Sequence, residues 1–64
     1  MKITKEQAQQ IALNRAPGAT VVKCHLDHDD GRMTYEIEMR KGFVEYDCEI
    51  DAQTGAILDW DMDD

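Results

Sequence analysis

Acidic residues at alternate positions are the part of this sequence that could do chemistry. Glu36 and Glu38 alternate with apolar residues in one segment, and Glu45 and Asp47 do so in the next. A period of two places these carboxylates on one face of a β-sheet. Glycosidases use a pair of carboxyl groups to hydrolyse the glycosidic bond. This reaction requires a cleft that raises the pKa of one carboxyl group, so that it can act as the acid. An open sheet face offers no such cleft, so we expect no catalytic residue and no enzyme.

The same carboxylates could instead receive a basic protein segment or a cation. The chain has 14 Asp and Glu against 7 Lys and Arg, a formal net charge of −7. This balance disfavours nucleic acid and anionic membrane surfaces, which both attract Lys and Arg. It is equally consistent with a charge that only keeps a small domain soluble. We expect a protein partner, no nucleic acid, no membrane insertion and no cofactor.

A second acidic cluster, around two histidines, invites comparison with a metal site. Its members are His25, Asp27, His28, Asp29 and Asp30. In a calcium loop that started at Asp27, the sixth position would be Gly, but Arg32 stands there. Zinc would require further nitrogen or sulfur ligands at fixed spacing. We interpret the cluster as a solvated hairpin loop and expect no metal ligand.

The elements that position these residues can be read from capping and periodicity. Thr4 and Gln7 form a capping box, and Pro17 ends the helix that follows. Alternation from Thr20 onward then indicates strands. A chain of 64 residues forms one domain, residues 1–64. We expect an α+β fold, one helix packed on a four-stranded antiparallel meander (α-β-β-β-β), with the helix at about 5–15 and strands at about 20–28, 33–40, 43–51 and 56–61.

Two turns predict how the strands pair. Asp30-Gly31 and Lys41-Gly42 each suit a two-residue hairpin turn. The first turn predicts the pairs Leu26–Tyr35, Cys24–Ile37 and Val22–Met39. The second predicts Met39–Val44, Ile37–Tyr46 and Tyr35–Cys48. On the other face, these registers oppose the charged residues Glu38 to Glu45, Glu36 to Asp47, Lys23 to Glu38 and His25 to Glu36.

Cys24 and Cys48 fall on the covered face of the first and third strands. Two strand spacings separate them by roughly 9–10 Å. A disulfide needs α-carbons closer than about 7 Å. We therefore expect two buried free thiols.

The last strand can be built in two ways. A four-residue loop from Ala52 to Gly55 sets Ile57 opposite Ile50. Without further irregularity, the strand then exposes an apolar strip on the wet face, made of Leu58, Trp60 and Met62. A bulge after Ile57 would instead return these residues to the core. Both arrangements are consistent with the sequence, and the first would create an interface for self-association.

Two short motifs together resemble a known family. The helix opening follows the pattern I-[TS]-x-E-x-A at Ile3, Thr4, Glu6 and Ala8, and Ala12 also matches the helix of the family. The last turn follows D-x-x-T-G at Asp51, Thr54 and Gly55. Both patterns are similar to those of the PepSY domain (peptidase propeptide and YpeB domain). The resemblance implies a helix leading into a sheet and a role in restraining peptidases, with Thr4, Asp51, Thr54 and Gly55 as structural cap and turn.

Three functions follow as expectations. The first is a non-catalytic binding module that contacts its partner through Glu36, Glu38, Glu45, Asp47, Leu58 and Trp60, with peptidase inhibition as the role that the resemblance implies. The second is a self-associating domain, such as a homodimer, that uses the last strand. The third is a cation-binding sensor module. The resemblance implies a place outside the cytoplasm, whereas the chain as it stands, without a leader, predicts a cytoplasmic one.

Overall fold

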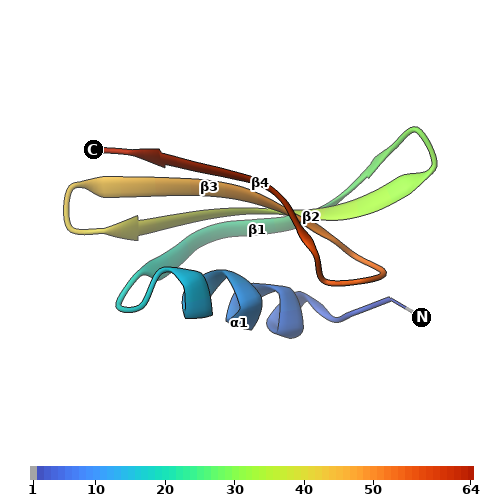
Figure 1. Ribbon diagram of the computed structural model, residues 1–64, viewed down its shortest axis with the longest axis horizontal. Coiled ribbons are helices and arrows are strands. Elements are labelled where there is room, and N and C mark those ends of the chain that lie inside the picture. The colour runs from blue at the N-terminus through green and yellow to red at the C-terminus, as the bar shows by residue number, and fades with distance from the viewer. Residues whose placement is uncertain (1) are drawn as a thin grey trace.

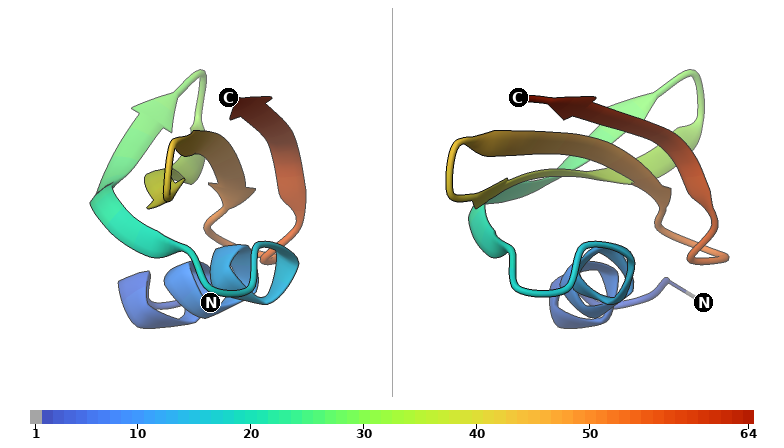
Figure 2. Two further views of the ribbon diagram at one scale, coloured as in Figure 1. Left: turned by 90° about the vertical axis from the view of Figure 1, so that its left-hand side faces the viewer. Right: turned by 60° about the vertical axis from the view of Figure 1, so that its left-hand side comes forward.

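The computed structural model describes residues 2–64, except for the side chain of Asp29. The chain runs through α1 (Lys5–Arg15), β1 (Thr20–Asp29), β2 (Arg32–Lys41), β3 (Val44–Asp51) and β4 (Ile57–Asp63). The strands form one antiparallel sheet in the order β1-β2-β3-β4. The helix covers one face of this twisted sheet (Figures 1 and 2). The expected α+β fold, in the order α-β-β-β-β, is confirmed.

The N-terminus of α1 is held by its cap and by the sheet. The Thr4 side chain accepts a hydrogen bond from the backbone N–H of Gln7, and the Gln7 side chain accepts one from the backbone N–H of Thr4. Tyr35 donates its hydroxyl proton to the carbonyl of Ile3 at 2.9 Å. The Ile3 N–H in turn donates to the carbonyl of Ala52 at 2.6 Å. These bonds tie the start of the helix to β2 and to the turn before β4.

The core lies between α1 and the covered face of the sheet. The helix contributes small side chains, the buried Ala8, Ala12 and Ala16. Alternate positions of the two central strands contribute the larger ones, Tyr35, Ile37, Met39, Cys48 and Ile50. Because alanine side chains are short, the helix axis can approach the sheet closely. Fully burying one large apolar side chain stabilises the fold by roughly 1.5–3 kcal/mol.

The predicted pairing of β2 with β3 is wrong by two residues. Lys41 opposes Val44, so the turn residues are Gly42 and Phe43. Gly42 has a φ of +62°, and glycine at the first central position is the requirement of a type II′ turn. The observed pairs are Tyr35–Ile50, Ile37–Cys48 and Met39–Tyr46. A shift of two keeps every side chain on its predicted face and changes only its partner.

The pairing of β1 with β2 is confirmed over most of its length. Leu26 opposes Tyr35, and Cys24 opposes Ile37. The third predicted pair is wrong, because Val21 opposes Met39 and the next residue, Val22, is the extra residue of a β-bulge. Val22 is consequently 52% exposed.

The bulge predicted as one alternative for β4 is present, but it returns only Trp60 to the core, while Leu58 and Met62 stay 39% and 59% exposed. Ile57 opposes Ile50, Asp59 opposes Glu49, and Leu58 between them has no partner on β3. Trp60 therefore opposes Cys48 on the covered face and packs partly buried against the core. The alternative of an exposed strip on the wet face is wrong, since the bulge reverses the side of every residue after Leu58.

Both cysteines are free thiols, as expected from their strand positions. Cys48 is buried, but Cys24 is only half-buried, which corrects the expectation of two buried thiols. Cys24 lies on the edge strand β1, where no further strand covers its side.

Candidate functional site

Acidic side chains gather on the outer face of the sheet, the face opposite α1. One row runs across all four strands through the paired positions His25, Glu36, Glu49 and Asp59. The next row runs parallel to it through Lys23, Glu38, Asp47 and Asp61. Side chains directly opposite on neighbouring strands have β-carbons about 4.5–5.5 Å apart. The two rows therefore bring six carboxylates together, accompanied by one lysine and one histidine.

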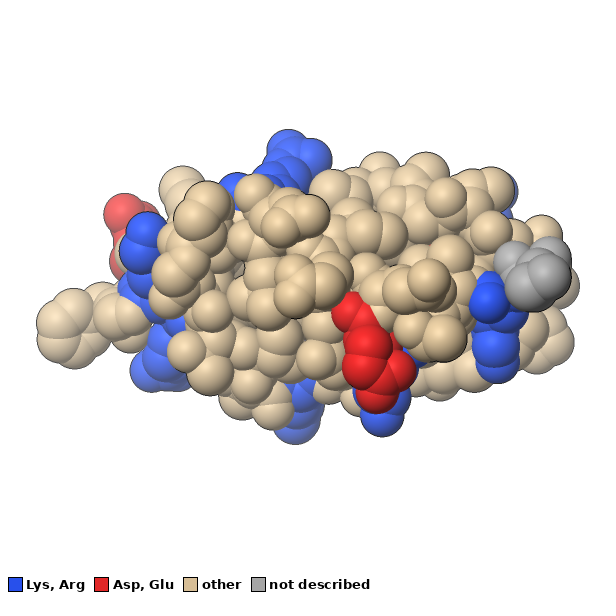
Figure 3. Space-filling model, turned by 90° about the horizontal axis from the view of Figure 1, so that it is seen from below, with Lys and Arg blue, Asp and Glu red and all other residues tan. Residues whose placement is uncertain are grey.

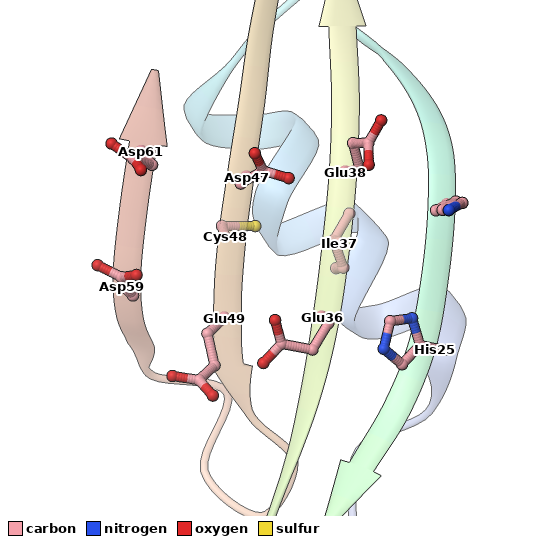
Figure 4. Close-up of a pocket in the computed structure, with 10 residues that line it drawn as sticks. His25, Glu36, Ile37, Glu38, Asp47, Cys48, Glu49, Asp59 and Asp61 are labelled. Atoms are coloured by element: carbon pink, nitrogen blue, oxygen red, sulfur yellow. The ribbon is translucent and has the colours of Figure 1, made fainter. Parts of the chain in front are cut away.

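These two rows surround a shallow hollow of about 330 Å³. Figure 4 shows its labelled carboxylates on β2, β3 and β4, with His25 on β1. Seen from the helix side, by contrast, the molecule presents several Lys and Arg side chains and few Asp or Glu (Figure 3). The charge is therefore distributed unevenly, with the acidic residues concentrated over the outer face.

The register corrects the predicted acid pairs. Glu38 opposes Asp47 rather than Glu45, and Glu36 opposes Glu49 rather than Asp47. The contacts with β1 are as predicted, with Lys23 opposite Glu38 and His25 opposite Glu36. The reason is again the turn at Gly42-Phe43, which moves β3 by two residues along β2. Opposed carboxylates remain at two positions between β2 and β3. Three further pairs lie between β3 and β4: Glu45–Asp63, Asp47–Asp61 and Glu49–Asp59.

Glu45 is neutralised outside the hollow. It opposes Arg40, and the Arg40 Nη2 lies 2.7 Å from the Glu45 Oε2. Both side chains are about half exposed, so the ion pair contributes little to stability. Of the four carboxylates predicted to bind a partner, Glu36, Glu38 and Asp47 line the hollow.

The closest electrostatic conflict lies between Glu36 and Glu49. Partial burial, a hydrogen bond to the Glu49 side chain and the negative charge of Glu49 raise the pKa of Glu36 to about 7. The charges of Asp27 and Asp59 add to this rise. Glu49 also accepts a 3.4 Å hydrogen bond from the Thr34 hydroxyl. Glu36 therefore changes its protonation state near neutral pH, well above the usual range of a carboxyl group.

The two apolar residues that were predicted to contact a partner lie apart from the hollow. Leu58 is 39% exposed and lies beside Thr34 and Glu49. Trp60 lies on the covered side, with its ring centroid 5.6 Å from that of Tyr46 and 4.7 Å from the guanidinium carbon of Arg15. This cation–π contact joins the last turn of α1 to β4.

Three carboxylates of the hollow were absent from the predicted site: Glu49, Asp59 and Asp61. Glu49 continues the alternation of Glu45 and Asp47 on β3, so the sequence carried a signal for it. Asp59 and Asp61 reach this face only because of the bulge at Leu58. The sequence shows that Asp59 and Asp61 alternate with apolar residues, but it does not show on which face of the sheet they lie.

The predicted cap and turn residues have structural roles. Asp51 accepts hydrogen bonds from the backbone N–H groups of Gln53 and Thr54 at 2.8 and 3.2 Å, which lowers its pKa. Arg32 adds a weaker favourable charge. Gly55 closes the turn with a φ of +80° and donates its N–H to the Asp51 carbonyl at 2.8 Å.

No cluster of three His, Cys, Asp or Glu side chains within the described part of the chain is arranged to hold a metal ion. The side chain of Asp29, a member of the histidine-rich loop considered above, lies outside the described residues. Within residues 2–64, the single helix is too short to cross a membrane.

The fold and the outer face define a small α+β domain with an acidic sheet surface. Its sequence matches the family model of the peptidase propeptide and YPEB domain over residues 2–61, so the chain belongs to the PepSY family. The expected resemblance is confirmed.

Two bacterial proteins are similar to this chain. The uncharacterized protein YkoJ of Bacillus subtilis (strain 168) is 44% identical over 63 residues, which are 97% of this chain and 36% of YkoJ. The crystal structure of a predicted lipoprotein from Clostridium difficile 630 superposes with a TM-score of 0.84 at 32% identity. That match covers 97% of this chain and 40% of the lipoprotein chain. The chain thus spans little more than a third of the length of the relatives it matches.

Proposed function

We propose that this chain is a non-catalytic binding domain whose acidic outer face receives a basic segment of a protein partner. One observation carries the proposal: six carboxylates from β2, β3 and β4 surround one hollow, and among the described residues only Lys23 and His25 are basic residues in its lining. Like charges placed directly opposite each other destabilise a sheet. Opposed like charges that the fold compensates only in part are typical of a functional surface.

The geometry of the face suits a charged segment better than a small molecule. The hollow is shallow, and its lining combines carboxylates with two basic side chains on the β1 edge. Charges within one Debye length, about 8 Å at physiological salt, act on a partner together. A segment with several Lys or Arg residues would lie across both rows and neutralise opposed pairs such as Glu38 and Asp47.

A peptidase is the partner class that the family description suggests. In this proposal, binding through the outer face restrains the peptidase without any reaction on the chain. We further propose that the domain works outside the cytoplasm. Its likeness to the predicted lipoprotein of Clostridium difficile 630 supports that location.

The test is calorimetric binding of a synthetic peptide with alternating Lys and Ser residues. We expect the double variant Glu38→Gln/Asp47→Asn to weaken binding at least about tenfold, because it removes two carboxylates of one row. The control Glu6→Gln/Asp30→Asn changes the net charge equally, but neither residue lines the hollow. We expect the control to change the affinity less than about twofold.

Two results would contradict the proposal. Equal weakening by both double variants would mean that only the net charge matters. Failure of the wild-type chain to bind the peptide, together with a rise in melting temperature on adding calcium chloride at constant ionic strength, would favour the cation-binding alternative instead.

A further inference from the structure

A shallow, widely open apolar groove lies beside the N-terminal end of α1. It has a volume of about 460 Å³, and its apolar floor is formed by Ile3, Ile11 and Gly55. A polar rim surrounds the floor, made of Glu6, Gln7, Gln10 and Thr54. A side chain on Gly55 would meet the Ile11 Cδ1 at 3.1 Å, so the glycine keeps the floor open. An apolar floor with a polar rim is the usual form of a site for one large anchoring side chain.

A single aromatic side chain projects from the opposite end of the molecule. Phe43, in the turn between β2 and β3, is 95% exposed and has no role in the core. Burying such a ring removes about 150–250 Å² of accessible surface from water, which is a large favourable contribution to the binding free energy for one residue. Lys41, at the end of β2, is exposed at the same end of the molecule. Its side chain lies over Gly18, with the Lys41 Cε 3.3 Å from the position of a β-carbon there.

A chain cannot place its own Phe43 in its own groove. Phe43 directly precedes β3, and the turn that forms one wall of the groove directly follows β3. Eight residues of extended strand separate the two by about 26 Å. Figure 1 shows the two turns at opposite ends of the molecule. Any contact between ring and groove must therefore join two chains.

We propose that Phe43 of one chain inserts into the Ile3–Ile11–Gly55 groove of a second copy. The charges of the two ends are complementary, since the exposed Lys41 lies at the same end of the molecule as the ring and Glu6 stands on the rim of the groove. The two surfaces differ, so the contact is heterologous and leaves a free ring and a free groove after each addition. The product is a head-to-tail series of copies. This contact is separate from the acidic outer face and from the last-strand interface considered above.

The contact is small and the association accordingly weak. One ring in one groove buries less than the 1,200 Å² that marks a standard interface. We expect the association to be measurable at protein concentrations near about 1 mM, where nuclear magnetic resonance detects it.

The test uses a chain whose own ring has been removed. Phe43→Ala, labelled with ¹³C at the isoleucine methyl groups, keeps an intact and unoccupied groove. Unlabelled wild-type chain is added in one titration and unlabelled Phe43→Ala in the other. We expect the methyl signals of Ile3 and Ile11 to shift with wild type, and the affinity for Phe43→Ala to be at least about tenfold lower. The buried Ile37 and Ile50 serve as internal references.

Two control variants keep the test decisive. Met62→Ala truncates another exposed apolar side chain, 59% exposed, and should bind the groove like wild type. Glu38→Gln/Asp47→Asn alters the outer face and should also bind unchanged, which separates this contact from peptide binding. Equal shifts with wild type and Phe43→Ala, shifts confined to residues outside the groove, or none at about 1 mM would each overturn the proposal.

Discussion

Glu36 and Glu49 stand directly opposite each other on β2 and β3, and hydrogen bonding to Glu49, together with its negative charge, helps to raise the pKa of Glu36. This relationship lies at the centre of the outer face. A sheet built for stability alone would place opposite charges at these positions. The conflict is partly relieved by a proton on Glu36, whose pKa of about 7 puts its titration within the physiological range.

The pair predicts that stability increases as the pH falls from about 8 to about 5.5. The pKa of Glu36 is raised in the folded chain above its usual 4.5, so folding favours the protonated form. The contribution of Glu36 to the free energy of unfolding is fully present below about pH 4.5 and is lost as the pH rises through about 7. Glu36→Gln should raise the melting temperature at pH 8 and flatten this part of the profile. Identical profiles for wild type and Glu36→Gln would contradict the assignment.

The opposite behaviour is expected of Asp51. Hydrogen bonds from Gln53 and Thr54 lower its pKa below the usual 3.8, so its contribution is present above pH 3.8 and is lost as the pH falls through the lowered value. Asp51→Asn keeps a similar acceptor but removes the charge. We expect it to lower the melting temperature at pH 7 and to reduce the loss of stability in acid. A variant that is as acid-sensitive as wild type would contradict this role.

The contact between Arg15 and Trp60 predicts a modest loss on truncation of the cation. Arg15→Ala should lower the free energy of unfolding by about 0.5–1 kcal/mol, with some additional loss of packing. Urea unfolding followed by the fluorescence of Trp60, the single tryptophan, measures the change. Lys5→Ala, at the other end of α1, is the matched control. An equal effect of the two variants would mean that the cation–π contact contributes nothing.

The bulge at Leu58 predicts which residue of β4 matters for the core. Leu58→Ala should cost about 0.5 kcal/mol or less, because the residue has no partner on β3 and its side chain is 39% exposed. Trp60→Ala should cost about 2 kcal/mol or more, because the ring packs against Tyr46 and Arg15. Chemical denaturation followed by circular dichroism compares the two without relying on tryptophan. The reverse order would show that the strand has no bulge.

The two thiols should differ in reactivity. Burial, with a smaller contribution from the charge of Asp47, raises the pKa of Cys48 to about 11, so almost none of it is thiolate at pH 8. Cys24 is half-buried on the edge strand. Alkylation by iodoacetamide, followed by peptide mass spectrometry, should modify Cys24 several times faster, and both equally in urea. Faster modification of Cys48 in the folded chain would be inconsistent with this structure.

The alternation of residues such as Tyr35 and Glu36 was enough to predict the fold and the face on which each side chain lies. Asp30-Gly31 was also sufficient to predict the turn between β1 and β2. Both central residues of this turn have positive φ, and few other dipeptides adopt that conformation as readily. Gly42 was ambiguous, since it fits either position of a two-residue turn. The wrong choice moved the strand by two residues, so the faces were right and the acid partners wrong.

The bulges at Val22 and Leu58 had no decisive local signal. A bulge depends on how the rest of the sheet packs, and here it places Trp60 over Cys48 rather than in water. The extent of the acidic surface depends on the same event, because Asp59 and Asp61 join it only after the bulge. The sequence therefore predicted carboxylates of the central strands, such as Glu36 and Glu38, but not those of the edge strand β4.

The most direct test of the outer face as a binding surface is amide chemical-shift mapping. Uniformly ¹⁵N-labelled chain is titrated with the alternating Lys-Ser peptide at low salt. We expect the largest shifts at Glu36, Glu38, Asp47, Glu49, Asp59 and Asp61, decreasing as sodium chloride is added. Shifts concentrated on α1, or spread evenly over the acidic residues of the whole chain, would contradict the proposal that the outer face is the binding surface.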